Sequence, residues 1–306
     1  GEKQNSEWVF ENIPISFNND KIKFNSSFSS FENYRLNIKS NKVNLSSVNS
    51  LLGFSQRFQG DIKGEFLYNK HNNANQLTIN SLLFNGQIDE IMYDSLFINI
   101  DANENKINYN KIKLVYENQS LIFSGEHLPN KKSDNLYRTG EINIIGNAEN
   151  FNLINVNNYI PISFNIGGEL SGIININGTP ESPEIIFKSI IKNPEFDLIK
   201  GRQLTGEINY KNEIASLENI NLQTLNGTYR GSGDIPINLN IFGRKSNFYN
   251  SPDLDISIIG ETTEFEFLSP YFEIVDSLTG HLSLNLDITG SLHTPIRNGE
   301  ININHA

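Results

Sequence analysis

The sequence predicts an all-β protein of mainly antiparallel tandem repeats, folded as one long, twisted and curled sheet with a short helix in each repeat. Two observations lead to this prediction. Apolar and polar residues alternate with a period of two over most of the chain, most regularly from His281 to Thr289, as in strands with one apolar face. A glycine-punctuated motif also recurs about every 110 residues.

The recurring motif opens at Gly168 and again at Gly280, 112 residues later, and Gly60 opens a partial copy 108 residues before Gly168. Because the chain lacks an initial Met and stops inside an expected strand, we expect a fragment of a longer protein. The period predicts four segments: the end of a preceding repeat at 1–42, repeats at 43–150 and 151–264, and the start of a third at 265–306.

A short stretch before each motif copy has apolar residues at helical spacing. In the third, Leu268, Tyr271, Phe272 and Val275 form a one-sided stripe. We therefore expect one short helix per repeat, with a core-capping role as the simplest interpretation. The three stretches are 43–54, 151–160 and 265–275.

Asn-Gly pairs at 85–86, 177–178, 226–227 and 298–299 predict hairpin turns, since both residues tolerate positive φ. Counting alternating runs gives about seven or eight strands per repeat, and roughly 4.8 Å between strands makes a sheet about 100 Å long. Such a sheet must curl, close on itself or split into two packed sheets, because twist accumulates from strand to strand.

Composition argues against several functional classes. The 35 acidic and 24 basic residues give a net charge of −11, spread along the chain, which disfavours a nucleic-acid partner. The same charge repels anionic headgroups, so any lipid contact should use acyl chains and an apolar surface. Cysteine is absent, which removes disulfides and thiolate metal sites. No stretch approaches the roughly 20 apolar residues of a membrane-spanning helix.

The sequence contains no recognisable catalytic, cofactor-binding or metal-binding pattern. Glu261, Glu264 and Glu266 precede and enter the third expected helix, where they suit the positive end of its dipole. We therefore expect neither an enzyme nor a bound cofactor or metal. The histidines show no metal-ligand spacing; they are His71, His127, His281, His293 and His305.

The motif G-x-L-x-G-x-h-x-h-x-G-T-x-x-x-P resembles the signature repeats of the TamB/AsmA-like family. The first copy keeps only its opening, Gly60 to Phe66, and in the third Leu284 replaces the second glycine. The second copy fits throughout, with Gly168, Leu170, Gly172, Ile174, Ile176, Gly178, Thr179 and Pro183.

This resemblance implies a taco-like β-groove in the cell envelope of a Gram-negative bacterium. The full-length protein would be anchored in the inner membrane, cross the periplasm and conduct phospholipid acyl chains toward the outer membrane. A BamA-type outer-membrane barrel would be its partner, through parts outside this chain, and the protein would also serve outer-membrane protein or autotransporter assembly.

Two hypotheses remain open for the row of apolar residues on one side of the alternating strands. In the first, the row lines an open lipid groove, which would leave an apolar trough well above the few hundred Å² usual on monomers. In the second, it is the closed core of a β-sandwich or solenoid, in a secreted or surface adhesin or scaffold that binds through its polar face. The predicted groove residues are Ile142, Ile144, Ile174, Ile176, Leu282, Leu284, Leu286, Ile288, Ile301 and Ile303.

Overall fold

The structure is a computed structural model. The chain forms two compact units, Gly1–Gly146 and Asn147–Ala306. The expected repeat boundaries at 42/43, 150/151 and 264/265 stay predictions. The structure describes residues 2–4, 7–17, 20–46, 58–72, 74–89, 91–130, 139–156, 166–196, 199–238, 247–248, 254–264, 279–291 and 294–304.

The first unit is an antiparallel ladder in which each strand pairs with the next along the chain, from β1 through β9, and β9 pairs with β10. β10 begins in this unit and ends in the second. The strands are β1 (Glu2–Gln4), β2 (Glu7–Phe17), β3 (Asp20–Ser30), β4 (Asn33–Asn44), β5 (Phe58–His71), β6 (Ala74–Ile88), β7 (Ile91–Asn103), β8 (Ile107–Tyr116), β9 (Gln119–Pro129) and β10 (Gly140–Asn152).

The second unit has the same design. Its main strands pair in the order β11, β12, β14, β15, β16, β18, β19 and β20, with two-residue strands β13 and β17 beside β12 and β16. The strands are β11 (Ile166–Gly178), β12 (Pro183–Phe196), β13 (Ile199–Lys200), β14 (Gln203–Lys211), β15 (Ile214–Gln223), β16 (Gly227–Asn238), β17 (Asn247–Phe248), β18 (Leu254–Glu264), β19 (Thr279–Ser291) and β20 (Thr294–Asn304).

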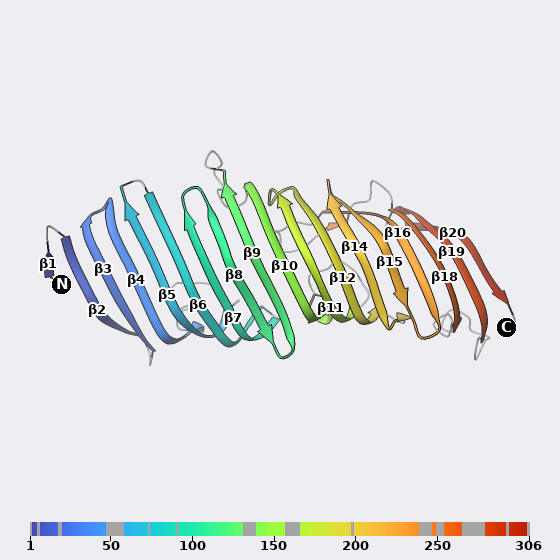
Figure 1. Ribbon diagram of the computed structural model, residues 1–306, viewed down its shortest axis with the longest axis horizontal. Helices are drawn as coiled ribbons and strands as arrows, with labels where there is room; N and C mark the ends of the chain where they lie inside the picture. The colour runs from blue at the N-terminus through green and yellow to red at the C-terminus, as the bar shows by residue number, and fades with distance from the viewer. Residues whose placement is uncertain are drawn as a thin grey trace. The chain divides into compact units, whose positions relative to one another are not determined.

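The predicted all-β, antiparallel class is confirmed. Every pairing with a described register is antiparallel, and the main strands of each unit run side by side in chain order (Figure 1). The alternation from Leu282 to Ile288 on β19 explains why this sequence forms a strand, because the two faces of such a strand meet different surroundings. The even-numbered residues there are buried or half-buried, whereas Asn285 and Asp287 are exposed.

Two of the four Asn-Gly turn predictions are correct. Residues 177–178 end β11 at the turn into β12, and 226–227 lie at the turn into β16, where Thr224 N donates to Gly227 O at 2.9 Å. Residues 85–86 instead lie inside β6, where Asn85 has φ 52° beside a bulge against β5. Residues 298–299 pair regularly within β20. An Asn-Gly pair therefore also serves bulges and close strand contacts.

The expected helices fall mostly outside the described residues. At the first, Val43 and Asn44 end β4 instead, and only Leu45 and Ser46 follow with helical backbone. At the second, β10 extends to Asn152 and a 3-10 turn, η1 (Leu153–Val156), follows. The third, 265–275, lies wholly outside. The strands thus run farther into these stretches than their helical spacing predicts.

Fully buried apolar side chains gather toward the hairpin ends of the strands in both units. One cluster lies beside the β6–β7 hairpin and the other beside the β14–β15 turn, which leaves the middle of each sheet half-buried. The buried residues of the clusters are Leu45, Leu83, Tyr93 and Leu96 in the first unit, and Tyr210, Ala215 and Ile237 in the second.

Candidate functional site

The second unit has one apolar face, assembled by strand register from eight strands. Directly paired residues on neighbouring strands point to the same side, so the printed sequence resolves into rows that cross the sheet. One row consists of Ile174, Phe187, Ile208, Leu217, Gly233, Ile256, Ile288 and Arg297. Another consists of Leu170, Ile191, Leu204, Leu222, Tyr229, Gly260, Leu284 and Ile301.

A row of smaller residues runs between these two. Its members on β11 and β20 are Gly172 and Gly299, and Ser189, Gly231, Ile258 and Leu286 lie between them. A Cβ on Gly299 would come within 2.0 Å of Asn285 O, so the backbones approach each other closely here. These three rows, together with the row of Ile176 and Ile185, are called the apolar face below. At about 4.8 Å per strand and 6.6 Å per row, the face measures roughly 34 Å by 20 Å.

Most side chains of the apolar face are only half-buried. Among the described elements, the main contacts run between ladder neighbours, and the exception is η1 on β11. No second sheet packs on this face within the described ranges. The part of the sheet that these rows cover is roughly 700 Å². The face is therefore large enough to hold an apolar ligand along its length.

The predicted residues of the second unit all point to the side of the apolar face, and Leu282 and Ile303 lie one row beyond it. Ile174 and Ile176 come from β11 and are half-buried. On β19, Leu282 is fully buried opposite Thr262, whereas the next three predicted residues, Leu284, Leu286 and Ile288, are half-buried. Ile301 and Ile303 are exposed because β20 has a described partner on one side alone; they pair with Leu284 and Leu282.

Ile142 and Ile144 belong to the first unit, on β10. Ile142 is buried and Ile144 half-buried. A Cβ on Gly125 of β9 would lie 2.7 Å from the Ile144 Cα, which places these two residues opposite each other. Ile144 therefore continues an apolar row of the first unit, which consists of Phe24, Ile38, Phe66, Ile79, Ile100, Tyr109 and Gly125.

Sequence reasoning missed the middle of the apolar face, on β12 through β18. β12 carries isoleucine on both sides: Ile185 and Ile191 lie on the apolar face, whereas Ile186 and Ile190 are exposed on the other. Alternation is hidden where both faces have apolar residues. Strand pairing from β11 outward is the signal that identifies these residues, since Ile174 pairs with Phe187.

The opposite face carries ion pairs between neighbouring strands, beside exposed isoleucines such as Ile186 and Ile190. Lys188 Nζ lies 3.1 Å from Glu207 Oε2, and Lys211 Nζ lies 2.7 Å from Glu184 Oε1. These pairs are exposed and each contributes at most about 1 kcal/mol. In the paired rows of the apolar face, Arg297 at the β20 edge is the charged residue. The two faces therefore differ sharply in charge.

Tyrosines on the apolar faces stay uncharged at neutral pH. Burial raises the pKa of Tyr229 in the second unit, and burial also raises the pKa of Tyr109 in the first. The Tyr229 ring covers Gly260, whose Cβ would lie 2.2 Å from the ring Cδ1. The phenols thus add polar tips to the faces without adding charge.

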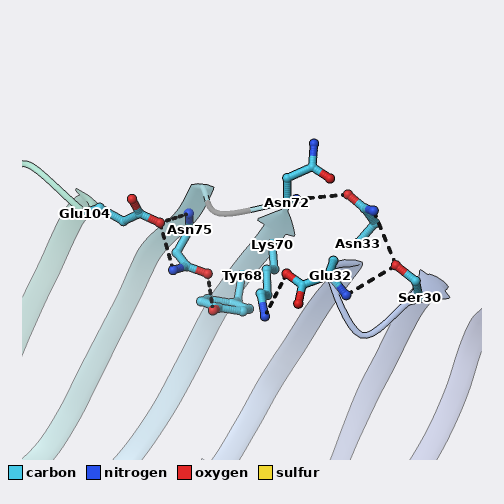
Figure 2. A network of polar contacts seen from close by, with 8 residues as sticks. All are labelled: Ser30, Glu32, Asn33, Tyr68, Lys70, Asn72, Asn75 and Glu104. Carbon is cyan, nitrogen blue, oxygen red and sulfur yellow. Dashed lines mark hydrogen bonds and ion pairs between the residues drawn. The ribbon is translucent and has the colours of Figure 1, made fainter.

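At the turn edge of β3 through β8, polar contacts join neighbouring hairpins of the first unit (Figure 2). Asn72 N donates to Asn33 Oδ1 at 3.0 Å, and Asn75 donates to Glu104 Oε1 through both its backbone N and its Nδ2. Tyr68 OH donates to Asn75 Oδ1 at 2.8 Å. The turn edge of β3 through β8 in the first unit is therefore a polar rim.

Over the described ranges, no three His, Asp or Glu side chains gather as a metal site would require. His127 is buried, with its Nε2 3.1 Å from Thr139 O, whereas His71 and His281 are exposed. His293 and His305 lie outside the described residues. In the part of the chain that the structure describes, no helix has the length and apolar character needed to cross a membrane.

Comparison with protein-family models, with characterised proteins and with solved structures finds no match for the chain.

Proposed function

We propose that this chain is a section of a lipid-conducting β-groove, in which the apolar face holds phospholipid acyl chains. The observation that supports this most is the continuous apolar face of the second unit, which spans eight strands and is exposed only at its β20 edge. An acyl chain needs a long apolar surface and no specific hydrogen bonds, which suits rows of Ile and Leu. The chain is acidic and would repel anionic headgroups, so the headgroups would stay in water while the acyl chains contact the apolar face.

The repeat motif extends the proposal to the cell. By its resemblance to the TamB/AsmA-like family, the full-length protein would be anchored in the inner membrane and cross the periplasm. It would move phospholipid between the inner and outer membranes, with a BamA-type barrel as partner and a contribution to outer-membrane protein assembly. No catalytic step is needed in this proposal, because the groove supplies a path and not a reaction.

A face-resolved crosslinking experiment tests the proposal. A photoreactive side chain is placed at Ile174 on the apolar face and, separately, at Ile173 on the opposite face. Ile173 is the more exposed of the two, at 53%. Lipid adducts found by mass spectrometry at position 174 and not at 173 support the proposal, because exposure alone would favour 173.

Leu286, on β19, provides an independent position on the same face. Adducts at 286 as well as at 174 would show that lipid contacts the apolar face near both of its ends, on β11 and on β19. Reproducible absence of lipid at both positions, or equal labelling at 173, would contradict the groove and favour a closed apolar core.

A further inference from the structure

The first unit carries five aromatic side chains that form one cluster beside the β3–β4 turn. Trp8, Phe28 and Tyr34 are direct cross-strand partners on β2, β3 and β4. The Phe28 and Phe31 rings meet edge to face with centroids 5.5 Å apart, and the Tyr34 and Tyr68 centroids lie 5.8 Å apart. These contacts connect all five residues, which are called the aromatic cluster below.

The aromatic cluster is exposed where an isolated protein would normally bury such residues. Phe31 is 84% exposed at the tip of the turn, and Trp8 is 49% exposed on β2. These two aromatic side chains leave apolar surface in water that burial against another apolar medium would stabilise. Phe31 lies at the tip of the turn and Trp8 on the neighbouring strand β2, so both can enter another apolar medium without any rearrangement of the sheet.

Polar groups surround the aromatic cluster on the rim side. Tyr68 OH donates to Asn75 at the rim, and Lys70 Nζ lies 3.6 Å from Glu32 Oε2 (Figure 2). Lys70 is also the cross-strand partner of Tyr34. Amphipathic aromatic side chains such as Tyr and Trp, mixed with Lys and amide groups, are typical of a membrane–water interface.

Local charge agrees with this environment. Residues 7–44 contain five basic and four acidic side chains, a net charge of +1, whereas the whole chain has −11. Most of the chain is therefore repelled by anionic headgroups, and this segment is not. A protein partner would also suit an apolar patch, but the rim chemistry and the local charge favour a lipid surface.

We propose that the aromatic cluster docks this end of the first unit on the interface of a phospholipid bilayer, with Phe31 and Trp8 at headgroup level. The proposal rests on the proposed function and adds the place where lipid would pass between a membrane and the sheet. It differs from the groove itself, since docking concerns the membrane surface and not single acyl chains on the apolar face.

Trp8 is the single tryptophan of the chain and reports directly on docking. The intact chain is mixed with vesicles of phosphatidylcholine and phosphatidylglycerol whose acyl chains are brominated close to the headgroup. We expect a blue shift and quenching of Trp8 emission. Bromination near the bilayer centre should quench less, which places the ring at the interface. Unchanged emission with every vesicle would overturn the proposal.

Phe31→Ser is the test variant, and Leu225→Ser is the matched control. Leu225 is another exposed apolar residue at a turn, in the second unit. Phe31→Ser should weaken vesicle binding about tenfold, because the inserted ring is lost, and Leu225→Ser should leave it unchanged. Circular dichroism should show both variants folded, since both side chains are exposed.

Equal weakening by the two variants would indicate general stickiness and overturn the docking proposal. So would a Trp8 shift that follows protein concentration without vesicles, which would assign the cluster to self-association. Crosslinking at Ile174 separates this proposal from the groove: lipid adducts at 174 without Trp8 quenching would refute docking and leave the groove intact.

Discussion

Replacing Ile258 by Asp should destabilise the second unit far more than the same replacement at Ile259, its chain neighbour. Ile258 lies on the apolar face between Gly231 and Leu286, and Ile259 points to the opposite face between Arg230 and Asn285. Ile259 is 51% exposed, whereas Ile258 is half-buried. The pair therefore separates the effect of the face from the effect of the residue type.

The magnitude follows from these surroundings. Ile258→Asp loses most of the burial of one isoleucine, about 1.5–3 kcal/mol, and places a partly dehydrated carboxylate on an apolar surface. We expect a loss of about 3 kcal/mol. Ile259→Asp costs at most about 1 kcal/mol in strand propensity, and the facing Arg230 returns a few tenths.

Urea unfolding followed by far-UV circular dichroism measures both variants against the parent chain. The free energies of unfolding of the two variants should differ by about 2 kcal/mol. The residues that pair with Ile258 and Ile259 in the parent chain provide no other difference of this size. Equal losses, or a larger loss at Ile259, would show that the strand register assigns the wrong residues to the apolar face.

Three further predictions concern other features of the sheets. Tyr93 donates a hydrogen bond to Gln59 O at 2.5 Å, and burial, with a smaller contribution from nearby Asp61, raises its pKa. The stabilisation from the protonated Tyr93 hydroxyl is complete below the pKa that tyrosine has in the unfolded chain, near 10, and is lost as pH rises above it. The fall in melting temperature at alkaline pH should therefore be smaller in Tyr93→Phe. Gly260→Val should destabilise by about 2 kcal/mol, since its Cβ meets the Tyr229 ring, and less in a Tyr229→Ala background, in denaturant titrations. Leu284→Asp in the full-length protein should block lipid supply to the outer membrane while circular dichroism stays unchanged; normal supply would count against the groove.

The strands and the apolar side of each strand were largely predictable, and the complete face was not. Period-two alternation marks β11 and β19, because each meets water on one side. It fails on β12, where Ile186 and Ile190 are exposed opposite Ile185 and Ile191. Alternation within one strand cannot show which strand lies next to it, and strand pairing is needed to assemble the rows.

Local turn chemistry was predictable in part for a similar reason. Asn and Gly both tolerate positive φ, and the fold uses that property at turns and at bulges alike. Asn85 has positive φ within β6, whereas Gly299 has no unusual φ and is required because a Cβ would collide with Asn285 O. Only the neighbouring strand distinguishes these cases.

Methyl NMR with a spin-labelled phospholipid tests the central claim most directly, because isoleucine occurs on both faces of the second unit. The label sits on the acyl chain, and the isoleucine methyl signals of the intact chain are compared before and after lipid is added. We predict strong broadening for Ile174, Ile208 and Ile256 on the apolar face, with little change for the more exposed Ile173 and Ile259. Broadening that follows exposure instead, strongest at Ile173 and Ile259 and absent from the apolar face, would show a closed face that takes no lipid.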